Sequence, residues 1–559
     1  MRSRQIFWEF LKITSNKSII NFLIICLLLI ITFVLETLSI FSITPILSIL
    51  GGENFNLNNA GFEKFLDIFI SDLNINNAIY FLVSCVVLKS IFLLFSIYIQ
   101  TKISLTSIKD IQKNIFKGLI TANYTYLSSF KSGHIANYIF PEMERLRKGA
   151  NTINSIVLNL IGVVVLFLGT LYVNINISLF FILSGSIIAS SFFILNNFFS
   201  KQGKLQTFNR NLVLHNIEFL LHNIKNFKII NKNFFFKKKI FYSINKLFKS
   251  DLLITISKKI SILYEPLIVV VIAILVIFLG VNKMDNMIAD LAIIVLIFNR
   301  IFGKINSVAS SLSALHLYES PLVKINEILI NQKNNRENYS GIKKFSLKKH
   351  ILIKDLSFKH KNKMVFEKLN IRIQAGKTTS IYAGSGKGKT TIADLLIKLH
   401  TKKSYKGKIY FDDQDIDELN PIYLRNKIAY ITQDTYLFDE TIRYNLAFAS
   451  DKNKDDEIIK YIKLFDLKNI FEKNKIDLDK KIISGGNNIS GGQKQRLLII
   501  RELIKKPKLI IFDEGLSSLE NSNKVKILNE VRNLLPSVTI INLTHDNFFR
   551  SISDDIIEL

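Results

Sequence analysis

The stretch IYAGSGKGKTT, residues Ile381–Thr391, decides how the C-terminal part of this chain folds. The apolar residues Thr379–Tyr382 predict a short strand, a glycine-bearing turn follows, and Lys389 opens an amphipathic helix that continues to Leu399. Backbone N–H groups in such a turn, together with the positive end of the helix, can surround a polyphosphate. The lysine ammonium would reach the outer phosphates, and the Thr390 hydroxyl would hold Mg²⁺. The stretch therefore predicts a phosphate-binding loop.

The loop departs from the pattern G-x-x-x-x-G-K-[ST] at one position. Ala383 stands where the first glycine is expected, and Gly384 follows it. Alanine fits there if the backbone at that residue needs no positive φ. Taken alone, the stretch is also compatible with an ordinary glycine-rich turn in a lysine-rich chain, so the surrounding sequence has to decide.

Length and composition predict more than one domain, with one of them in a membrane. The chain has 559 residues, of which 49% are apolar, and its mean hydropathy is +0.27. That is too long for a single domain and too apolar for an ordinary soluble protein. The two cysteines, Cys26 and Cys85, lie in apolar runs, so the sequence indicates neither a disulfide framework nor a cysteine-based metal cluster.

Six apolar runs precede the phosphate-binding loop, each near or above the ~20 residues that cross a bilayer as a helix. They lie at about 19–50, 78–99, 153–174, 176–198, 260–281 and 288–312. The segment 51–76 between them is acidic, whereas 100–152 and 199–259 are basic, so the positive-inside rule places the basic segments and both termini in the cytoplasm. This placement accounts for much of the net charge of +28 without nucleic acid. A lysine-rich RNA-binding surface is the alternative, but aromatic residues are not interleaved with the basic ones in a recognised pattern.

The basic segments are predicted to continue the spans as amphipathic helices. Within 100–120, isoleucines recur at helical spacing while Lys109, Lys113 and Lys117 lie on another face. The turn Tyr126–Gly133 and the apolar patch Ile224–Ile230 would then lie at the tips of these helices. Either could be a docking surface for the following domain or an ordinary end of a helical hairpin.

Ionisable residues inside the spans are the candidate substrate contacts. Glu36, Lys89, Glu265 and Arg300 lie in four different apolar runs. Such residues usually face protein or water and not lipid. They would line a polar cavity that handles a charged substrate, or they would form internal ion pairs that fix helix packing.

Four further short motifs follow the phosphate-binding loop in a fixed order. Singly, each has a plain structural interpretation, as a core strand of a parallel sheet or as a helix cap. Their joint occurrence in one order is specific. They are IAYITQ at Ile428–Gln433, ISGGQ at Ile489–Gln493, LIIFDE at Leu509–Glu514 and IINLTH at Ile540–His545.

This set of motifs resembles the nucleotide-binding domain of ATP-binding cassette (ABC) proteins. Six spans with long cytoplasmic loops, placed ahead of one such domain, resemble a half-transporter of the exporter type. The resemblance implies an α-helical six-span transmembrane domain with long cytoplasmic helical extensions over 1–315, a linker over 316–345, and an α/β P-loop ATPase domain of ABC type over 346–559. Because the spans place the chain in a membrane, a soluble cassette ATPase acting on nucleic acid is excluded.

The resemblance also implies ATP and Mg²⁺ as ligands and gives each motif a role. Lys389 and the loop backbone would hold the β- and γ-phosphates, Thr390 and Asp513 would position Mg²⁺, and Gln433 would ligate Mg²⁺ and sense the nucleotide. Glu514 would be the general base for the attacking water, and His545 would contact the γ-phosphate. The predicted nucleotide contacts are Ala383, Gly384, Ser385, Gly386, Lys387, Gly388, Lys389, Thr390 and Thr391, with His360, Ser490, Gly491, Gly492 and Gln493.

In the geometry of this family, Ser490–Gln493 close over ATP that a second subunit holds. The resemblance therefore implies a dimer, either of two copies of this chain or with a paralogous half-transporter. Four positions besides Ala383 depart from the family pattern. His360 replaces the aromatic residue that stacks on adenine, Glu520 replaces an aspartate, and Ile483 and Ser484 replace Gly-Glu.

The first span and the acidic loop after it resemble the bacterial lipid-linked oligosaccharide flippases of this superfamily. The resemblance implies a multi-pass protein of the bacterial inner membrane, in contact with membrane lipids, that flips or exports an amphipathic, lipid-linked anionic substrate. Lys89 and Arg300, with Glu36, are the candidate substrate residues. The alternatives are a multidrug, lipid or peptide exporter and an ATP-gated regulatory membrane protein. The intact Glu514 argues against the regulatory protein, because gating does not need repeated hydrolysis.

Overall fold

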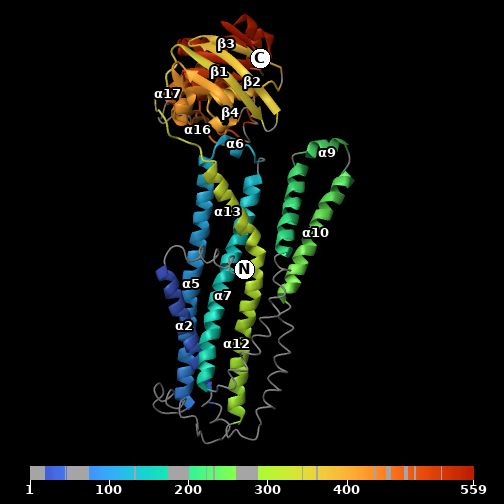
Figure 1. Ribbon diagram of the computed structural model, residues 1–559, viewed down its shortest axis with the longest axis vertical. Helices are drawn as coiled ribbons and strands as arrows, with labels where there is room; N and C mark the ends of the chain where they lie inside the picture. The colour runs from blue at the N-terminus through green and yellow to red at the C-terminus, as the bar shows by residue number, and fades with distance from the viewer. Residues whose placement is uncertain are drawn as a thin grey trace. The chain divides into compact units, whose positions relative to one another are not determined.

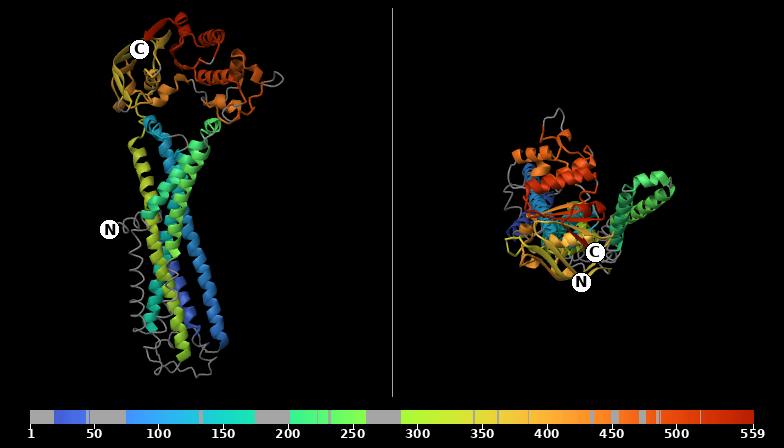
Figure 2. Two further views of the ribbon diagram at one scale, coloured as in Figure 1. Left: turned by 90° about the vertical axis from the view of Figure 1, so that its right-hand side faces the viewer. Right: turned by 90° about the horizontal axis from the view of Figure 1, so that it is seen from above.

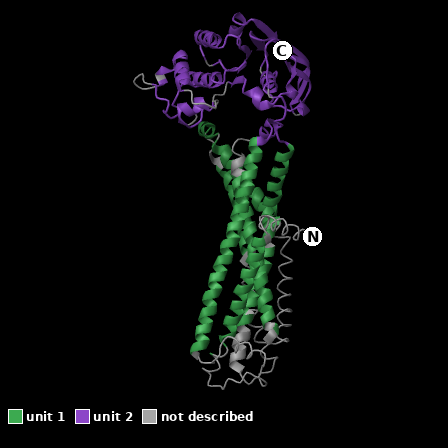
Figure 3. Cartoon of the chain, turned by 90° about the vertical axis from the view of Figure 1, so that its left-hand side faces the viewer, with its two compact units in different colours: residues 1–120, 130–334 green, residues 121–129, 335–559 purple. Residues whose placement is uncertain are grey.

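The structure is a computed structural model that divides the chain into two compact units (Figure 3). Unit 1 consists of Met1–Ile120 and Phe130–Asn334, and unit 2 consists of Thr121–Ser129 and Asn335–Leu559. The residues that the structure describes are 19–43, 46, 75–130, 134–173, 201–221, 223–230, 233–259, 287–342, 344–360, 363–384, 386–432, 436–448, 455–470, 476–483, 486, 488–517 and 519–559.

Nearly all the described residues of unit 1 are helical (Figure 1). Among them, Ile20–Phe41, Asn76–Thr121 and Ile139–Gly169 are long and apolar enough to cross a membrane. The spans predicted at 176–198 and 260–281 lie outside the described residues. The helices are α2 (Ile19–Phe41), α5 (Ile75–Thr121), α7 (His134–Val173), α9 (Ile224–Ile230), α10 (Asn233–Lys259), α12 (Met287–Leu315) and α13 (Glu319–Asn334), and residues 201–221 are also helical.

Helix α5 continues the second predicted span far beyond the bilayer length, as the sequence pattern predicts. Ile108 and Ile115 are buried in a cluster with Met143 and Leu146 of α7. The lysines at 109, 113 and 117 are exposed. The amphipathic extension is therefore confirmed, with its apolar face packed against a neighbouring helix and its charged face in solvent.

The range 316–345, predicted as the linker, is helical over much of its length. A 3₁₀ turn, η3 (His316–Tyr318), leads into α13, and Leu322 and Ile325 of α13 join the buried cluster of α5 and α7. The polar composition of this range hid an apolar stripe at the i, i+3 spacing of a helix. The predicted domain boundaries themselves stay a prediction.

Unit 2 contains a four-stranded antiparallel sheet and a five-stranded parallel sheet. The antiparallel sheet has the order β2-β1-β4-β5, and the parallel sheet has the order β6-β7-β8-β3-β9. The strands are β1 (His350–His360), β2 (Lys363–Gln374), β3 (Thr378–Tyr382), β4 (Tyr405–Phe411), β5 (Gln414–Asp415), β6 (Ile428–Thr432), β7 (Leu509–Asp513), β8 (Thr539–Thr544) and β9 (Asp555–Glu558).

The parallel sheet has a separate apolar core on each face. Along β7, Ile510 and Phe512 belong to one core, while Leu509 and Ile511 belong to the other, as the alternation of a strand requires. Helix α14 packs in the second core and α18 in the first, so they cover opposite faces of the sheet. The helical elements of unit 2 besides α6 are α14 (Lys389–Leu396), α15 (Pro421–Arg425), α16 (Ile442–Ala447), α17 (Asp455–Leu464), α18 (Gly491–Leu503), α19 (Asn521–Leu534), and the 3₁₀ turns η4 (Lys402–Ser404), η5 (Ile416–Glu418), η6 (Lys468–Ile470) and η8 (Asn547–Ser551).

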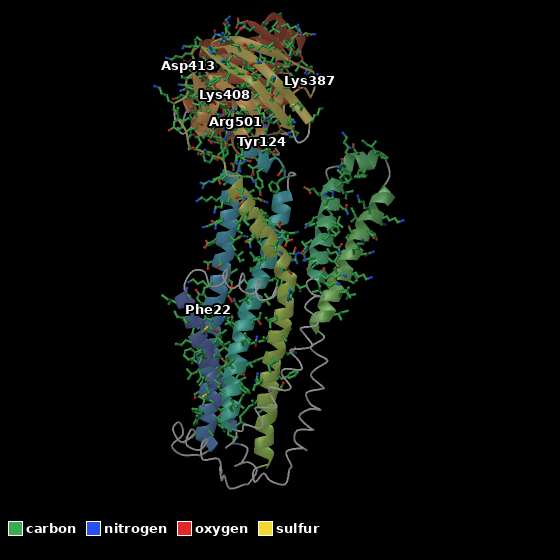
Figure 4. The ribbon with its side chains drawn as sticks, in the orientation of Figure 1. Phe22, Tyr124, Lys387, Lys408, Asp413 and Arg501 are labelled. Carbon is green, nitrogen blue, oxygen red and sulfur yellow. The ribbon has the colours of Figure 1, made fainter. Side chains whose placement is uncertain are left out.

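Part of one predicted helix tip belongs to unit 2, namely residues 126–129 of the turn Tyr126–Gly133. The segment Thr121–Ser129 contains the short helix α6 (Tyr124–Leu127) and pairs with the chain just after α13. The Asn123 N–H donates to the carbonyl of Asn335 at 2.8 Å, and the Glu337 N–H donates to the carbonyl of Thr121 at 2.8 Å. The Tyr124 ring, labelled in Figure 4, lies edge-on to His400 with the centroids 6.5 Å apart. The segment Thr121–Ser129 is therefore packed into unit 2.

Candidate functional site

The predicted nucleotide residues follow the carboxyl ends of neighbouring parallel strands. Ala383 comes directly after β3, Glu514 directly after β7, and His545 directly after β8. Parallel α/β sheets bind ligands at this edge. Gln433 follows β6, but it lies outside the described residues, as does Ser385 in the loop.

The phosphate-binding loop has the conformation that its glycines permit. Gly386 and Gly388 have φ values of 77° and 95°, a left-handed conformation that glycine adopts without strain. A Cβ on Gly388 would lie 2.4 Å from the ring of Phe366, so this position excludes a larger residue. Ala383 is not among the positive-φ residues, which meets the condition under which alanine can replace the first glycine. Gly388 is the N-cap of α14, whose first turn points its free N–H groups toward the loop.

Lys389 is held inside the loop by two oxygen atoms. Its side chain is 8% exposed, and Nζ lies 3.4 Å from Oε1 of Glu514. Nζ also donates a hydrogen bond to the carbonyl of Ala383 at 2.8 Å. A lysine already fixed over its own loop loses little side-chain entropy when phosphate oxygens bind.

Glu514 lies between a cation and an imidazole. Its Oε1 is 3.4 Å from Lys389 Nζ and 3.1 Å from His545 Nδ1. The backbone of Glu514 has φ 53°, unusual for a residue with a side chain, and its N–H donates to the carbonyl of Leu543 at 3.0 Å. The sheet thus fixes the Glu514 carboxylate beside Lys389 and His545. A general base and a phosphate-contacting side chain are expected together at such a site.

The residues assigned to Mg²⁺ have suitable donor chemistry. Asp513 is 8% exposed as a residue, and its Oδ2 accepts a hydrogen bond from the Tyr430 hydroxyl at 3.0 Å. Carboxylate and hydroxyl oxygens suit Mg²⁺, which is usually bound by one or two protein ligands, substrate phosphates and water. Among the described residues, no group of three or more His, Cys, Asp or Glu side chains is arranged to hold a metal. Asp513 and Thr390 thus fit an ion held largely by a nucleotide.

The remaining residues predicted to contact the nucleotide lie on elements other than the phosphate-binding loop and the strand ends beside it. His360 is an exposed residue at the end of β1. Ser490 caps α18, where its side chain and that of Gln493 form a reciprocal capping box. Because α18 lies on the opposite face of the sheet from α14, Ser490–Gln493 and the phosphate-binding loop come from opposite sides of the parallel sheet. Of the departures from the family pattern, Glu520 is the N-cap of α19, and Ile483 is exposed.

Sequence reasoning missed three polar residues behind the loop. Burial, and then the charge of Asp513, raise the pKa of Asp394 on α14 to about 6. His400 lies 3.9 Å from Asp394, and burial, followed by the charge of His360, lowers the pKa of His400. Tyr430 is the third. Asp394 lies on the helix that the loop opens, but its i, i+5 spacing from Lys389 is not a same-face spacing, so the sequence carried no signal for it.

The candidate substrate residues meet in unit 1. Glu36 is 4% exposed on its side chain, and its carboxylate lies 3.3 Å from Lys89 and 3.8 Å from Arg300. Lys304, one helical turn after Arg300, lies 3.6 Å from the same carboxylate and 4.1 Å from the centre of the Phe33 ring. The sequence did not single out Lys304, although its i, i+4 spacing from Arg300 places it on the same helix face. Glu265 lies outside the described residues.

Comparisons with known proteins show which proteins this chain is similar to. Residues 366–517 match the family described as ABC transporter. The chain is 35% identical over 199 residues to the microcin-J25 export ATP-binding/permease protein McjD of Escherichia coli, covering 35% of this chain and 34% of that protein. It is 32% identical over 197 residues to the ATP-dependent lipid A-core flippase of Francisella novicida, covering 35% and 33%. These alignments therefore span about a third of the length of each relative.

A solved structure matches nearly the whole chain. It is a bacterial Atm1-family ABC exporter with ATP bound, with a TM-score of 0.75 and 17% sequence identity. The match covers 96% of this chain and 92% of the exporter chain. At this identity the likeness establishes the fold alone, a helical N-terminal part followed by an α/β part.

Proposed function

This chain carries an ATP-binding domain of the ABC transporter family on the fold of an exporter-type half-transporter, and from that premise we propose that it is an ATP-hydrolysing membrane transporter. The observation that carries the proposal is the convergence of Lys389, Glu514 and His545 within 3.4 Å contacts at the end of the parallel sheet. If Lys389 and Glu514 formed only a structural ion pair, the pair would need neither the adjacent phosphate-binding loop nor the histidine that follows β8.

The geometry supports hydrolysis of the γ-phosphate by in-line attack of water. Lys389 and the loop N–H groups would hold the β- and γ-phosphates, and Mg²⁺, held by Thr390, Asp513 and Gln433, would neutralise the charge on the phosphates. Glu514 would accept a proton from the water as the water oxygen bonds to phosphorus and the bond to the β-phosphate oxygen breaks. His545, 3.1 Å from Glu514, would contact the γ-phosphate and orient that carboxylate.

A dimer of two copies is proposed as the working unit. The capped N-terminus of α18 and the phosphate-binding loop lie on elements that cover opposite faces of one sheet. Ser490–Gln493 of one copy would therefore complete the site on the second copy. A paralogous half-transporter could take the same place. With its basic loops and both termini in the cytoplasm, the dimer would cross the bacterial inner membrane.

An anionic, amphipathic substrate fits the charges inside the helical unit. Glu36 pairs with Lys89, Arg300 and Lys304, so three cations share one carboxylate among the described residues. Phosphate or pyrophosphate oxygens can displace Glu36 from one of these cations and take its place. We propose a lipid-linked glycan or a related anionic lipid as the substrate. The second candidate is peptide export, favoured by the similarity to the microcin exporter.

The test is ATP hydrolysis by the full chain in proteoliposomes. Magnesium-dependent hydrolysis is expected, and Lys389→Ala should abolish it because the phosphates lose their cation. Undiminished hydrolysis by Lys389→Ala would show that the loop has been misread. A panel of polyprenyl-pyrophosphate glycans, anionic glycolipids and peptides would then be added, and stimulation is expected with the anionic lipids.

The charge cluster has its own test. Replacing both Lys89 and Lys304 with methionine should remove stimulation by anionic lipids and leave basal hydrolysis within about twofold of wild type, because side chains of similar length keep the packing. An equally stimulated variant would assign the cluster to helix packing alone. Lys102→Met, on the exposed side of α5, is the matched control and should keep stimulation.

A further inference from the structure

Lys524 is a buried cation that the proposed chemistry does not use. It lies on α19, its side chain is 5% exposed, and Nζ donates to Oδ2 of Asp546 at 2.7 Å. Nζ also donates to Oδ1 of Asn521 at 3.1 Å, and it lies 5.4 Å from the centre of the Phe548 ring. Burying an ammonium group costs free energy unless a partner is held in good geometry, so the position of Asp546 is tightly specified.

Asp546 is the residue directly after His545. Its N–H donates to Oγ1 of Thr544 at 2.9 Å, and its carbonyl accepts from the Tyr382 hydroxyl at 3.1 Å. Its Oδ1 accepts from the Phe548 N–H at 3.0 Å. These bonds fix the short turn that carries the His545 side chain between β8 and η8. The hydrogen bond from Lys524, then that from the Phe548 N–H, lower the pKa of Asp546, so it is a carboxylate at neutral pH.

Helix α19 connects this turn to the segment that carries the general base. Its N-cap, Glu520, lies six residues after Glu514 in the sequence, and the Lys524 N–H donates to the Glu520 carbonyl at 3.0 Å in the first helical turn. The Lys524 side chain then crosses to the His545 turn. Lys524 thus ties together the segment following Glu514 and the turn holding His545, and those two side chains meet at 3.1 Å.

We propose that Lys524 is a positioning residue for hydrolysis, which holds the turn at Asp546 so that His545 stays in reach of Glu514 and the γ-phosphate. This inference rests on the proposed ATPase function. Lys524 does not touch the nucleotide in this scheme, so it acts on the rate of the chemical step and not on nucleotide affinity. A small displacement of a group at the reacting atoms is enough to slow catalysis by about ten- to a hundredfold.

Lys524→Met in the full-length protein is the first test, because methionine keeps the contacts with the phenylalanine rings and removes the charge. We expect kcat for ATP to fall about ten- to a hundredfold, with KM and the affinity for a fluorescent ATP analogue unchanged. Trapping of ADP with vanadate, which imitates the reacting γ-phosphate, should fall in parallel. Lys505→Met removes a comparable partly buried pair with Glu502, at 2.6 Å, and should leave all four quantities unchanged.

A mutant cycle separates positioning from general destabilisation. Asp546→Asn is nearly isosteric, should lower kcat as Lys524→Met does, and gives the same test if the methionine variant fails to fold. The double variant should lose no more than the worse single variant, because both act through one pair. The charge-swapped variant Lys524→Glu with Asp546→Lys should recover part of the lost kcat.

Two results would overturn the proposal. One is a wild-type kcat in both single variants; the other is a loss of ATP affinity and melting temperature that matches the loss of kcat, which would assign Lys524 to stability alone. Failure of the ATPase proposal itself looks different, because the wild-type protein would then show no magnesium-dependent hydrolysis for any variant to lower.

Discussion

Glu514 is the residue on which the assigned chemistry depends most directly. It is held by a strained backbone with φ 53° and by contacts with a lysine and a histidine. Replacement by glutamine keeps the shape of the side chain and removes its basicity.

We therefore expect Glu514→Gln to lower turnover by about a hundredfold or more while the nucleotide still binds. The variant should accumulate as a nucleotide-bound dimer, measured by size-exclusion chromatography with bound ATP quantified. Asp413→Asn, an exposed carboxylate labelled in Figure 4, is the control and should behave as wild type. Steady hydrolysis by the glutamine variant would remove Glu514 from the role of base.

For single residues, the sequence predicted which kinds of side chain form the site better than it predicted which residues contact one another. Asp513, Glu514 and His545 lie at strand ends where their motifs predicted strands to end, because a parallel sheet puts every carboxyl end at one edge. Lys389 begins α14, where the sequence predicted a helix. The sequence did not indicate Lys524 and Tyr430, because each acts through a distant partner. Lys524 pairs with Asp546, 22 residues away, and Tyr430 pairs with Asp513, 83 residues away. No local pattern records such pairs.

Among the helices and strands, α14 carries an ionisable side chain, Asp394, whose pKa is shifted by folding. Asp394 has a folded pKa of about 6 against an ordinary value of 3.8, caused first by burial and then by Asp513. When folding raises the pKa of a carboxyl group, the folded protein loses stability as the pH rises from the unfolded-state pKa to the folded-state pKa, because the buried group must then ionise. The His400 ring and the Tyr430 hydroxyl also face this region, with His360 and Tyr124 acting on them in turn.

Asp394→Asn should therefore be more stable than wild type at neutral pH and nearly equal to it below about pH 4. We expect the difference to grow to about 1–2 kcal/mol between about pH 4 and pH 6, after allowing for solvent screening. Thermal unfolding of the detergent-solubilised chain at several pH values measures it. A difference that does not change with pH would contradict the burial of an ionisable Asp394.

Element prediction worked where periodicity is long and failed where an element is short or mixed. The 47-residue helix α5 followed from its apolar span and amphipathic continuation. Helix α13 falls in the range predicted as the linker, because its polar and charged residues are numerous and its buried Leu322 and Ile325 are sparse. Burial against α5 and α7, which is a tertiary effect, decides its structure.

For the whole molecule, the central expectation is a site shared between two copies. Neither a Lys389→Ala homodimer nor a Ser490→Arg homodimer should hydrolyse ATP, because each lacks one half of both sites. Mixing the two chains during expression creates heterodimers with one intact site. Random pairing then predicts recovery of about a quarter of wild-type hydrolysis if sites act independently. If purified heterodimers hydrolyse no ATP, then either both sites must be intact for hydrolysis at either one, or each chain builds its site alone.

The division in Figure 3 assigns the segment Thr121–Ser129 to a unit whose remaining residues begin only at Asn335. In the residue-number colouring of Figure 2 this segment is blue, while the remaining residues of its unit run from yellow to red. The ribosome thus releases this tip roughly two hundred residues before its partners, which at ~5–20 residues per second is a wait of roughly 10–40 s. During that interval the ends of α6 have no strand or turn to pair with. Translation speed across the intervening helices, and the chaperones present meanwhile, therefore become part of how this protein is assembled.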